Sequence, residues 1–283
     1  MQVRKAMFAG SWYPQKAGDC RQEIEGYLAE GQQWPAVQGP FVGGIVPHAG
    51  WYFSGSLACN VVRCLAEAGG ADVVAVFGMH LHPESPNFMM THGAWETPFG
   101  ELPIAEELAA DLMERFRFEV ETASAFQPDN TIELQLPFIK FFMPDVRILP
   151  LGVPPKAASL SIGEAVADAA QQRGLSLKVI GSTDLTHYGR NYGLRSHGSG
   201  AEALKWVRER NDRRIIEAMV ELDAPRVIEE ALRHQNACCS GAAAAAMTAA
   251  AALGAEKPVA VHYTTSYDKS PGDSFVGYVG ILM

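Results

Sequence analysis

The sequence predicts an α/β fold with a partly parallel sheet, for two reasons. Short β-branched runs end at glycine or proline and are followed by stretches of helical periodicity, as in residues 42–46 and 54–68. Polar residues that include histidine follow these runs, at the strand ends where open α/β sheets place their ligands. We therefore expect a functional site at one edge of the sheet.

The first half of the chain alternates strands and helices. An aromatic, proline-containing segment precedes a helix over 17–32. The strand over 42–46 ends at Pro47 and leads to His48. A second strand over 71–77 runs directly into Gly78-Met-His-Leu-His-Pro83. Residues 88–102 predict a strand pair with a turn. Residues 104–117 predict a helix, with acidic residues early and arginines late as the helix dipole prefers.

The second half continues the alternation. Asp129 is suited to cap a helix that carries Glu133, and strands over 146–153 and 177–181 flank a helix over 160–173. The latter strand runs into Ser182-Thr-Asp-Leu-Thr-His-Tyr-Gly189, so a histidine follows a strand for the third time. Helices over 201–222 and 225–234 lead to Asn236-Ala-Cys-Cys-Ser-Gly241 and an alanine-rich helix. Strands over 259–265 and 274–282 close the chain.

Length and composition favour one large domain over residues 1–283. The 283 residues contain no obvious linker or repeat, 48% of them are apolar, and the net charge is −9. Such a charge argues against nucleic acid or an anionic membrane as a partner. Because the chain begins without an apolar signal segment and has no long apolar run, we expect a cytoplasmic protein.

The cysteines do not indicate a disulfide framework. Their number is odd and no CxxC pair occurs, so a structural zinc knuckle is not indicated either. They are Cys20, Cys59, Cys64, Cys238 and Cys239. The last two lie where the alanine-rich helix is expected to begin, a position that favours thiolate over thiol.

Several of these pieces, taken in order, resemble the MEMO family, which includes the mediator of ErbB2-driven cell motility and AmmeMemoRadiSam system protein B. They are Pro47-His-Ala-Gly-Trp, Gly78-Met-His, Trp95-Glu-Thr-Pro, Ile132-Glu-Leu-Gln-Leu-Pro-Phe, Ser182-Thr-Asp-Leu-Thr-His-Tyr-Gly, Asn236-Ala-Cys-Cys-Ser-Gly and Asp273-Ser-Phe-Val-Gly-Tyr. The resemblance covers nearly the whole chain. It implies the LigB-like fold of class III extradiol dioxygenases, a three-layer α/β sandwich with a central mixed sheet and a metal pocket at one end.

The resemblance also implies a mononuclear metal site. Its ligands are His48, His80 and Cys239, and Asp184 and His187 stand beside it as the catalytic residues. The chain departs from the family pattern in the loop after Gly78, where counting back from the Trp95 block selects His80 and leaves His82 as an alternative. Cys238 is likewise an alternative to Cys239.

A second departure is Asn130, which stands where the family usually has a histidine. The expected pocket therefore lacks one group that can transfer a proton. Glu133 has two interpretations, a carboxylate that supports the pocket or one on a helix surface or cap. Trp51 and Tyr188 either wall the pocket or pack beside it.

Two imidazoles and a thiolate suit iron or copper, with one ion per chain, and three protein ligands leave positions open for other molecules. Together with this ligand set, the resemblance to class III extradiol dioxygenases implies a metal-dependent oxidoreductase that acts on a small organic substrate with dioxygen. Asp184 is expected to accept an imidazole N–H and His187 to donate a proton. Hydrolysis is weaker because no acidic base adjoins a ligand as in H-E-x-x-H.

The alternative is a non-catalytic protein that binds a redox metal or a peptide in the same pocket. For bacterial members, the resemblance further implies partners of the radical SAM and AMMECR1-like classes.

Overall fold

A nine-stranded mixed sheet forms the centre of the molecule. The computed structural model describes residues 2–283, and the strands of this sheet lie in the order β10-β12-β2-β9-β3-β8-β4-β7, with β11 paired to β12. They are β2 (Gly43–Val46), β3 (Val73–Gly78), β4 (Asn87–Met90), β7 (Phe118–Glu121), β8 (Arg147–Gly152), β9 (Leu177–Ser182), β10 (His187–Tyr188), β11 (Val259–Thr265) and β12 (Phe275–Leu282). A three-stranded sheet joins β1 (Val3–Arg4), β5 (Ala94–Thr97) and β6 (Gly100–Pro103).

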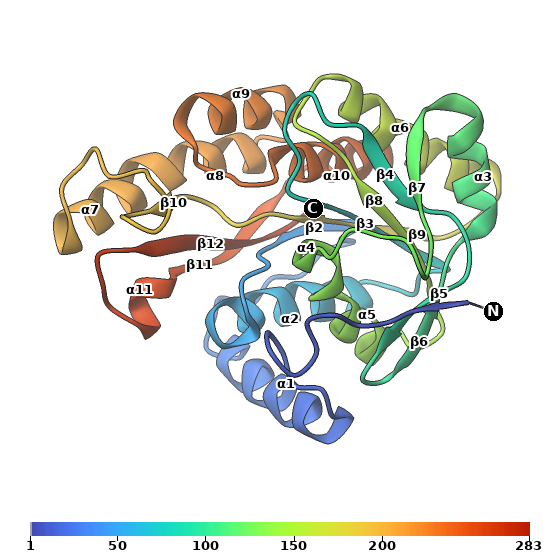
Figure 1. The fold of residues 1–283 in the computed structure, drawn as a ribbon, viewed down its shortest axis with the longest axis horizontal. Coiled ribbons are helices and arrows are strands. Elements are labelled where there is room, and N and C mark those ends of the chain that lie inside the picture. The colour runs from blue at the N-terminus through green and yellow to red at the C-terminus, as the bar shows by residue number, and fades with distance from the viewer. Residues whose placement is uncertain (1) are drawn as a thin grey trace.

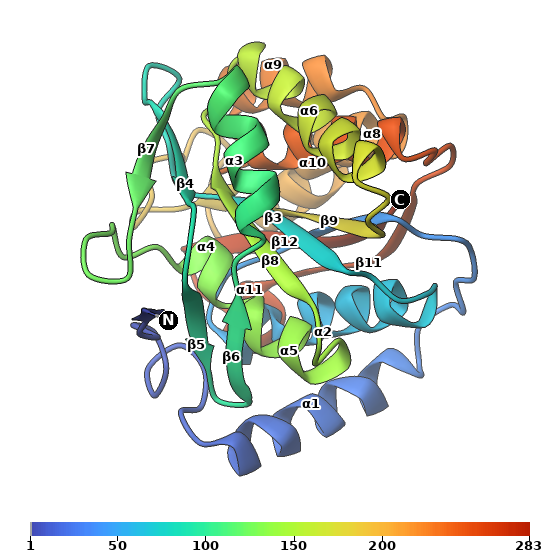
Figure 2. The same cartoon turned by 90° about the vertical axis from the view of Figure 1, so that its right-hand side faces the viewer.

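Helices cover both faces of the large sheet (Figures 1 and 2). On one side lie α3 (Glu106–Arg115), α6 (Ala158–Gln172), α8 (Asp212–Val220), α9 (Ala224–His234) and α10 (Ser240–Ala252). On the other lie α1 (Ala17–Gly31), α2 (Trp51–Glu67) and α5 (Leu136–Phe142). Strands β2, β9, β3 and β8 are parallel neighbours, whereas β12 pairs antiparallel with β2 and β4 antiparallel with β8. The predicted three-layer α/β sandwich with a central mixed sheet is therefore confirmed.

The central strands are apolar throughout because both of their faces are buried. Along β3, Val73, Ala75 and Phe77 pack into the core beneath α6 and α10, while Val74 and Val76 pack into the core beside α2. This alternation follows from the two-residue period of a strand. A parallel sheet covered on both faces consequently has continuous apolar strands rather than alternating ones.

The alanine-rich helix α10 lies close against its neighbours because its side chains are small. A Cβ atom added to Gly163 of α6 would overlap the backbone of Ala245 in α10. At the start of α10, a Cβ atom on Gly241 would meet the backbone of Pro154, which follows β8. The beginning of α10 is thereby held next to the carboxyl ends of the parallel strands.

The smallest elements differ from the sequence prediction. The expected helix through Glu133 is two short helices, α4 (Asn130–Glu133) and α5, the second of which has a proline in its first turn. The charged stretch after Gly200 forms α7 (Gly200–Trp206), a π-helical turn η1 (Val207–Asn211) and α8. The predicted loop between the last strands contains α11 (Ser266–Lys269).

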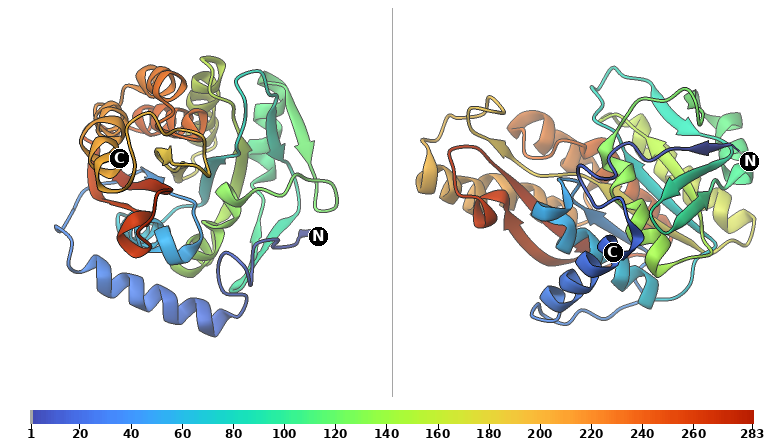
Figure 3. Two further views of the ribbon diagram at one scale, coloured as in Figure 1. Left: turned by 60° about the vertical axis from the view of Figure 1, so that its left-hand side comes forward. Right: turned by 60° about the horizontal axis from the view of Figure 1, so that its bottom comes forward.

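The part of the molecule formed by α7, β10, α11 and the β11–β12 pair projects away from α3 (Figures 1 and 3). Among residues 2–283, no helix combines the length and the apolar character needed to cross a bilayer.

Candidate metal centre

Adjacent parallel strands bring the predicted site residues together at one sheet edge. His48 follows β2, Asp184 follows β9 and His80 follows β3, and these strands are neighbours in the order β2-β9-β3. Cys239 is the N-cap residue of α10. The strand-end pattern in the sequence thus arises because parallel strands deliver their carboxyl ends to a common place.

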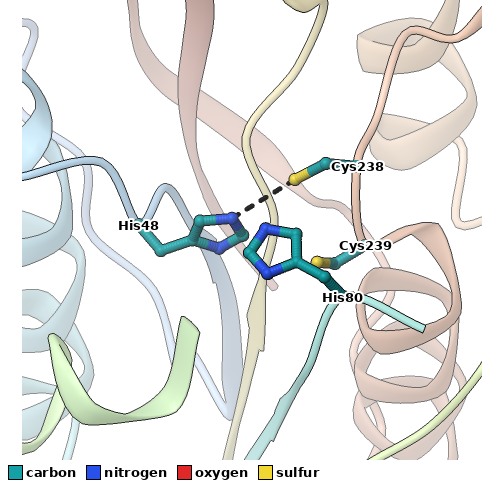
Figure 4. Close-up of side chains that lie close together, drawn as sticks. All are labelled: His48, His80, Cys238 and Cys239. Carbon is teal, nitrogen blue, oxygen red and sulfur yellow. Dashed lines mark hydrogen bonds between the residues drawn. The ribbon is translucent and has the colours of Figure 1, made fainter. Parts of the chain in front are cut away.

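Four side chains that can bind a metal converge at this edge (Figure 4). One ligand atom from each of His48, His80, Cys238 and Cys239 lies within 4.8 Å of the corresponding atoms of the others. The imidazole rings of His48 and His80 meet edge to face with their centroids 4.9 Å apart. His48 Nε2 and Cys238 Sγ lie 3.2 Å apart.

Ser182 determines which nitrogen of His48 faces the cluster. Its Oγ–H donates to the carbonyl of Thr131 at 2.7 Å, so Oγ accepts a hydrogen bond from Nδ1–H of His48 at 2.9 Å. The neutral His48 ring then has its lone pair on Nε2, which points toward the thiols. Ser182 was not identified from the sequence, because a serine at the end of a buried strand resembles many others.

Asp184 has a role different from the one predicted. Instead of accepting an imidazole N–H, its Oδ1 accepts the backbone N–H of His48 at 2.7 Å, and its Oδ2 lies 4.0 Å from His48 Nε2. Asp184 is buried, and burial raises the pKa of its carboxyl group. The carboxylate therefore fixes the backbone of His48, while the ring is oriented by Ser182.

Burial lowers the pKa of His48, but the nearby Asp184 and Cys238 outweigh burial and the net pKa is raised. Together with the lowered pKa of Cys238, this shift favours a protonated imidazole beside a negatively charged sulfur.

Asp129 and the left-handed backbone conformation of Met79 position His80. Its Nδ1 lies 3.5 Å from Asp129 Oδ2, and Asp129 also caps α4 by accepting the N–H of Thr131. The preceding residue, Met79, has a φ of 73°, and its N–H donates to Thr131 Oγ1 at 2.7 Å. A left-handed conformation is costly for methionine and is maintained here by these contacts.

Between the two histidines of this loop, the structure places His80 in the cluster. His82 is exposed and its Nδ1 accepts the backbone N–H of Glu84. Asp129 was recognised from the sequence only as a helix cap. Its second function, holding His80, depends on the packing of α4 against the end of β3.

The two adjacent cysteines lie between α9 and α10, where their backbone contacts the loop that follows β9. The N–H of Cys238 donates to the carbonyl of Asp184 at 3.1 Å, and that of Cys239 donates to Thr183 Oγ1 at 3.0 Å. Burial raises the pKa of Cys238, but Cys239 and the two imidazoles outweigh it and hold this pKa well below its usual value. Burial and the neighbouring Cys238 hold the pKa of Cys239 well above its usual value.

A cavity of about 540 Å³ opens beside the cluster. Its lining combines polar groups, including His48, His80, Asp184 and several serines, with aromatic side chains. The aromatic residues are Trp12, Tyr52, Phe53, Tyr192 and Tyr278. A mainly apolar wall with a few converging polar groups is typical of small-molecule sites.

His187 and Asn130 line this cavity without joining the donor cluster. Nδ1–H of His187 donates to the carbonyl of Leu185 at 3.1 Å, and the ring contacts Tyr192 edge to face. Nε2 of His187 is therefore the nitrogen left for exchange with a bound molecule. The Nδ2 amide of Asn130 donates to the carbonyl of His48 at 2.8 Å, so Asn130 holds the backbone of the site.

Glu133 does not lie on a helix surface and supports the cavity only indirectly. It is buried, and its carboxylate accepts the N–H groups of Met7 and Phe8 and the hydroxyl of Tyr13. It thus anchors the N-terminal segment whose Trp12 reaches the cavity.

Trp51 and Tyr188 pack rather than wall the cavity. Trp51 stacks on Phe138 and Tyr188 on Phe275.

The comparisons with known proteins identify the family. A family model described as Memo-like protein matches residues 4–282. A MEMO1 family protein of Pyrococcus furiosus is 31% identical over 99% of both chains, and one of Methanopyrus kandleri is 32% identical over 99% of this chain and 98% of its own. One of Pyrobaculum aerophilum is 30% identical over 100% of this chain and 99% of its own.

A solved structure supports the fold. The uncharacterized protein JW3007 from Escherichia coli K12 superposes with a TM-score of 0.53 and 11% sequence identity, covering 85% of this chain and 98% of that one.

Proposed function

Because the chain belongs to the Memo-like protein family, we propose that it binds one iron or copper ion through His48, His80 and Cys239 and oxidises a small organic molecule with dioxygen. The observation that carries this proposal is the convergence of imidazole nitrogens and thiol sulfurs within 4.8 Å, beside a cavity of about 540 Å³. These donor types suit borderline-soft ions, so the residues present fit the expected metal.

The orientation of His48 supports this fit. Its Nδ1–H donates to Ser182 Oγ, and its Nε2 faces the other donor atoms of the cluster. A metal-binding histidine commonly uses its second nitrogen in this way, which fixes the tautomer and the plane of the ring. The bound ion would supply electron transfer and activation of oxygen.

The cavity residues would position the substrate and move protons. His187, with Nδ1–H bound to Leu185, presents Nε2 as the atom that accepts or returns a proton. Asp184 accepts the backbone N–H of His48 and Asn130 donates to its carbonyl, so the imidazole keeps its position when a molecule enters the cavity. The aromatic side chains would contact the apolar part of a substrate.

A metal titration tests the proposal. Under anaerobic conditions, Fe(II) or copper should bind at one ion per chain, and His48→Ala should lose stoichiometric binding because the remaining donors cannot complete the shell. His92→Ala, which changes an exposed histidine next to Thr91, is the matched control and should bind as the wild type does. Equal binding by the wild type and His48→Ala would contradict the assignment.

Asn130 favours a second candidate, a protein that binds a redox metal or a peptide in this pocket without turnover. Its amide is committed to the carbonyl of His48 and supplies no proton. Mass spectrometry of the purified protein for a retained small molecule, followed by oxygen consumption with that molecule, separates the candidates. Metal binding without oxygen consumption would select the non-catalytic function.

A further inference from the structure

Cys238 is a residue of the site for which the three-ligand proposal has no use. Its Sγ lies 3.2 Å from His48 Nε2 and accepts the backbone N–H of Asp184 at 3.3 Å. A thiol that served only to fill space would face apolar side chains. The surroundings of this sulfur are instead an imidazole nitrogen and an amide N–H, which are the surroundings of a sulfur that carries negative charge.

The position of Cys238 is fixed by the backbone. Its own N–H is bound to the carbonyl of Asp184, and the N–H of Cys239 is bound to Thr183. Close contact of Gly241 with the backbone of Pro154 then holds the start of α10 against the strand ends. Both thiols are therefore directed at the imidazoles before any ion arrives (Figure 4).

The spacing of the donor atoms suits four ligands around one ion. The four atoms lie within 4.8 Å of one another. Tetrahedral ligands at 2.0–2.3 Å from an ion are separated from each other by about 3.3–3.8 Å. The upper limit of 4.8 Å exceeds these separations by only about 1 Å.

We propose that Cys238 is a fourth protein ligand, so that the ion is held by two imidazoles and two thiolates rather than by two imidazoles and one thiolate. This inference rests on the proposed metal site and raises its number of protein ligands from three to four. Cys238 Sγ and His48 Nε2 share a hydrogen bond, and a bound ion would take the place of its proton.

With a fourth protein ligand, the number of coordination positions left for other molecules depends on which metal is bound. An ion that prefers four tetrahedral ligands, such as Zn²⁺, is fully surrounded and has no position for a further molecule. An ion that accepts six ligands would retain two positions for other molecules. The second thiolate also shifts the preference of the site toward softer ions.

Cobalt spectroscopy on the intact protein tests the proposal, because the intensity of the thiolate-to-cobalt charge-transfer bands scales with the number of bound thiolates. With saturating Co(II) under anaerobic conditions, Cys238→Ala and Cys239→Ala should each lose about half of the wild-type intensity. The double variant should lose all of it. Cys64→Ala, which removes a buried thiol of α2 outside the cluster, is the control and should retain it.

Two outcomes would overturn the fourth ligand while leaving a metal site. In one, Cys238→Ala keeps the full intensity and Cys239→Ala loses all of it; in the other, the two variants exchange these results. If wild-type protein binds no cobalt, iron or copper, the proposed function itself fails. X-ray absorption of the wild-type cobalt protein gives the answer without variants: two sulfur neighbours support the proposal, and one overturns it.

Discussion

Ser182 lies between the backbone of α4 and the imidazole of His48, and its hydroxyl sets the tautomer of that ring. Ser182→Ala should therefore lower the metal affinity by about 10–100-fold while the protein still folds, since Nδ1 of His48 loses its acceptor. Competition with a coloured chelator measures this change. Ser56→Ala is the control, because Ser56 is also buried and its Oγ has no hydrogen-bond partner. Equal losses in both variants would indicate a general packing effect.

His187 lines the cavity but lies outside the donor cluster. If the protein turns over a substrate, His187→Ala should bind the metal normally and lose about 10²–10⁴-fold in rate, the usual contribution of general acid–base assistance. The measurement is oxygen consumption with a molecule that co-purifies with the protein. Wild-type oxygen consumption by the variant would exclude a proton-transfer role for His187.

At the level of single residues, the sequence predicted which residue types come together in the site but not all of their hydrogen-bond partners. His48, His80 and Asp184 were predictable because each follows a strand, and parallel strands share an edge. Ser182 and Asp129 were missed in their site roles because a hydroxyl at a strand end and a carboxylate at a helix cap have common local functions. Their additional partners come from other elements, which local patterns do not specify.

Among the elements, α8 is joined to the site loop by Asp212, which accepts the N–H of Thr186 at 3.0 Å and the hydroxyl of Tyr263 in β11 at 2.7 Å. Burial raises the pKa of Asp212 from 3.8 to about 6. The folded state thus binds a proton that the unfolded state has released. The stability from this group is fully present below pH 3.8 and is lost as the pH rises through about 6.

Asp212→Asn should remove this pH dependence and retain both hydrogen bonds, since an amide can accept from Thr186 and donate to Tyr263. The difference in the free energy of unfolding between wild type and variant should therefore fall by about 2 kcal/mol from pH 4.5 to pH 7. Urea unfolding across this range measures it. A constant difference would show that Asp212 does not titrate in the folded protein.

Elements with strong periodicity were predicted well, whereas short edge elements were not. The apolar runs of β3, β8 and β9 and the long helices α1, α2 and α6 appear within a few residues of their expected bounds. β1, β7 and β10 were missed because two to four residues contain too little pattern. Their strand character comes from the partner they pair with, such as Glu121 of β7 beside Met90 of β4.

For the whole molecule, binding at the proposed metal site would be linked to folding, because its donors come from separate elements. Metal at about 100 times its dissociation constant should raise the free energy of unfolding by about 2.7 kcal/mol. His48→Ala should show little of this increase. Thermal or urea unfolding with and without metal measures it. An equal increase in His48→Ala would mean that the ion stabilises the protein from another site.

The distance along the chain between the paired donors also has a consequence for synthesis. His48 and Cys238 are 190 positions apart. A ribosome that adds about 5–20 residues per second needs roughly 10–40 s to produce the second after the first. During this interval the two histidines have been synthesised and the two cysteines have not, so a nascent chain has only two of the four proposed ligands. At the proposed site, metal loading would therefore follow the synthesis of Cys238.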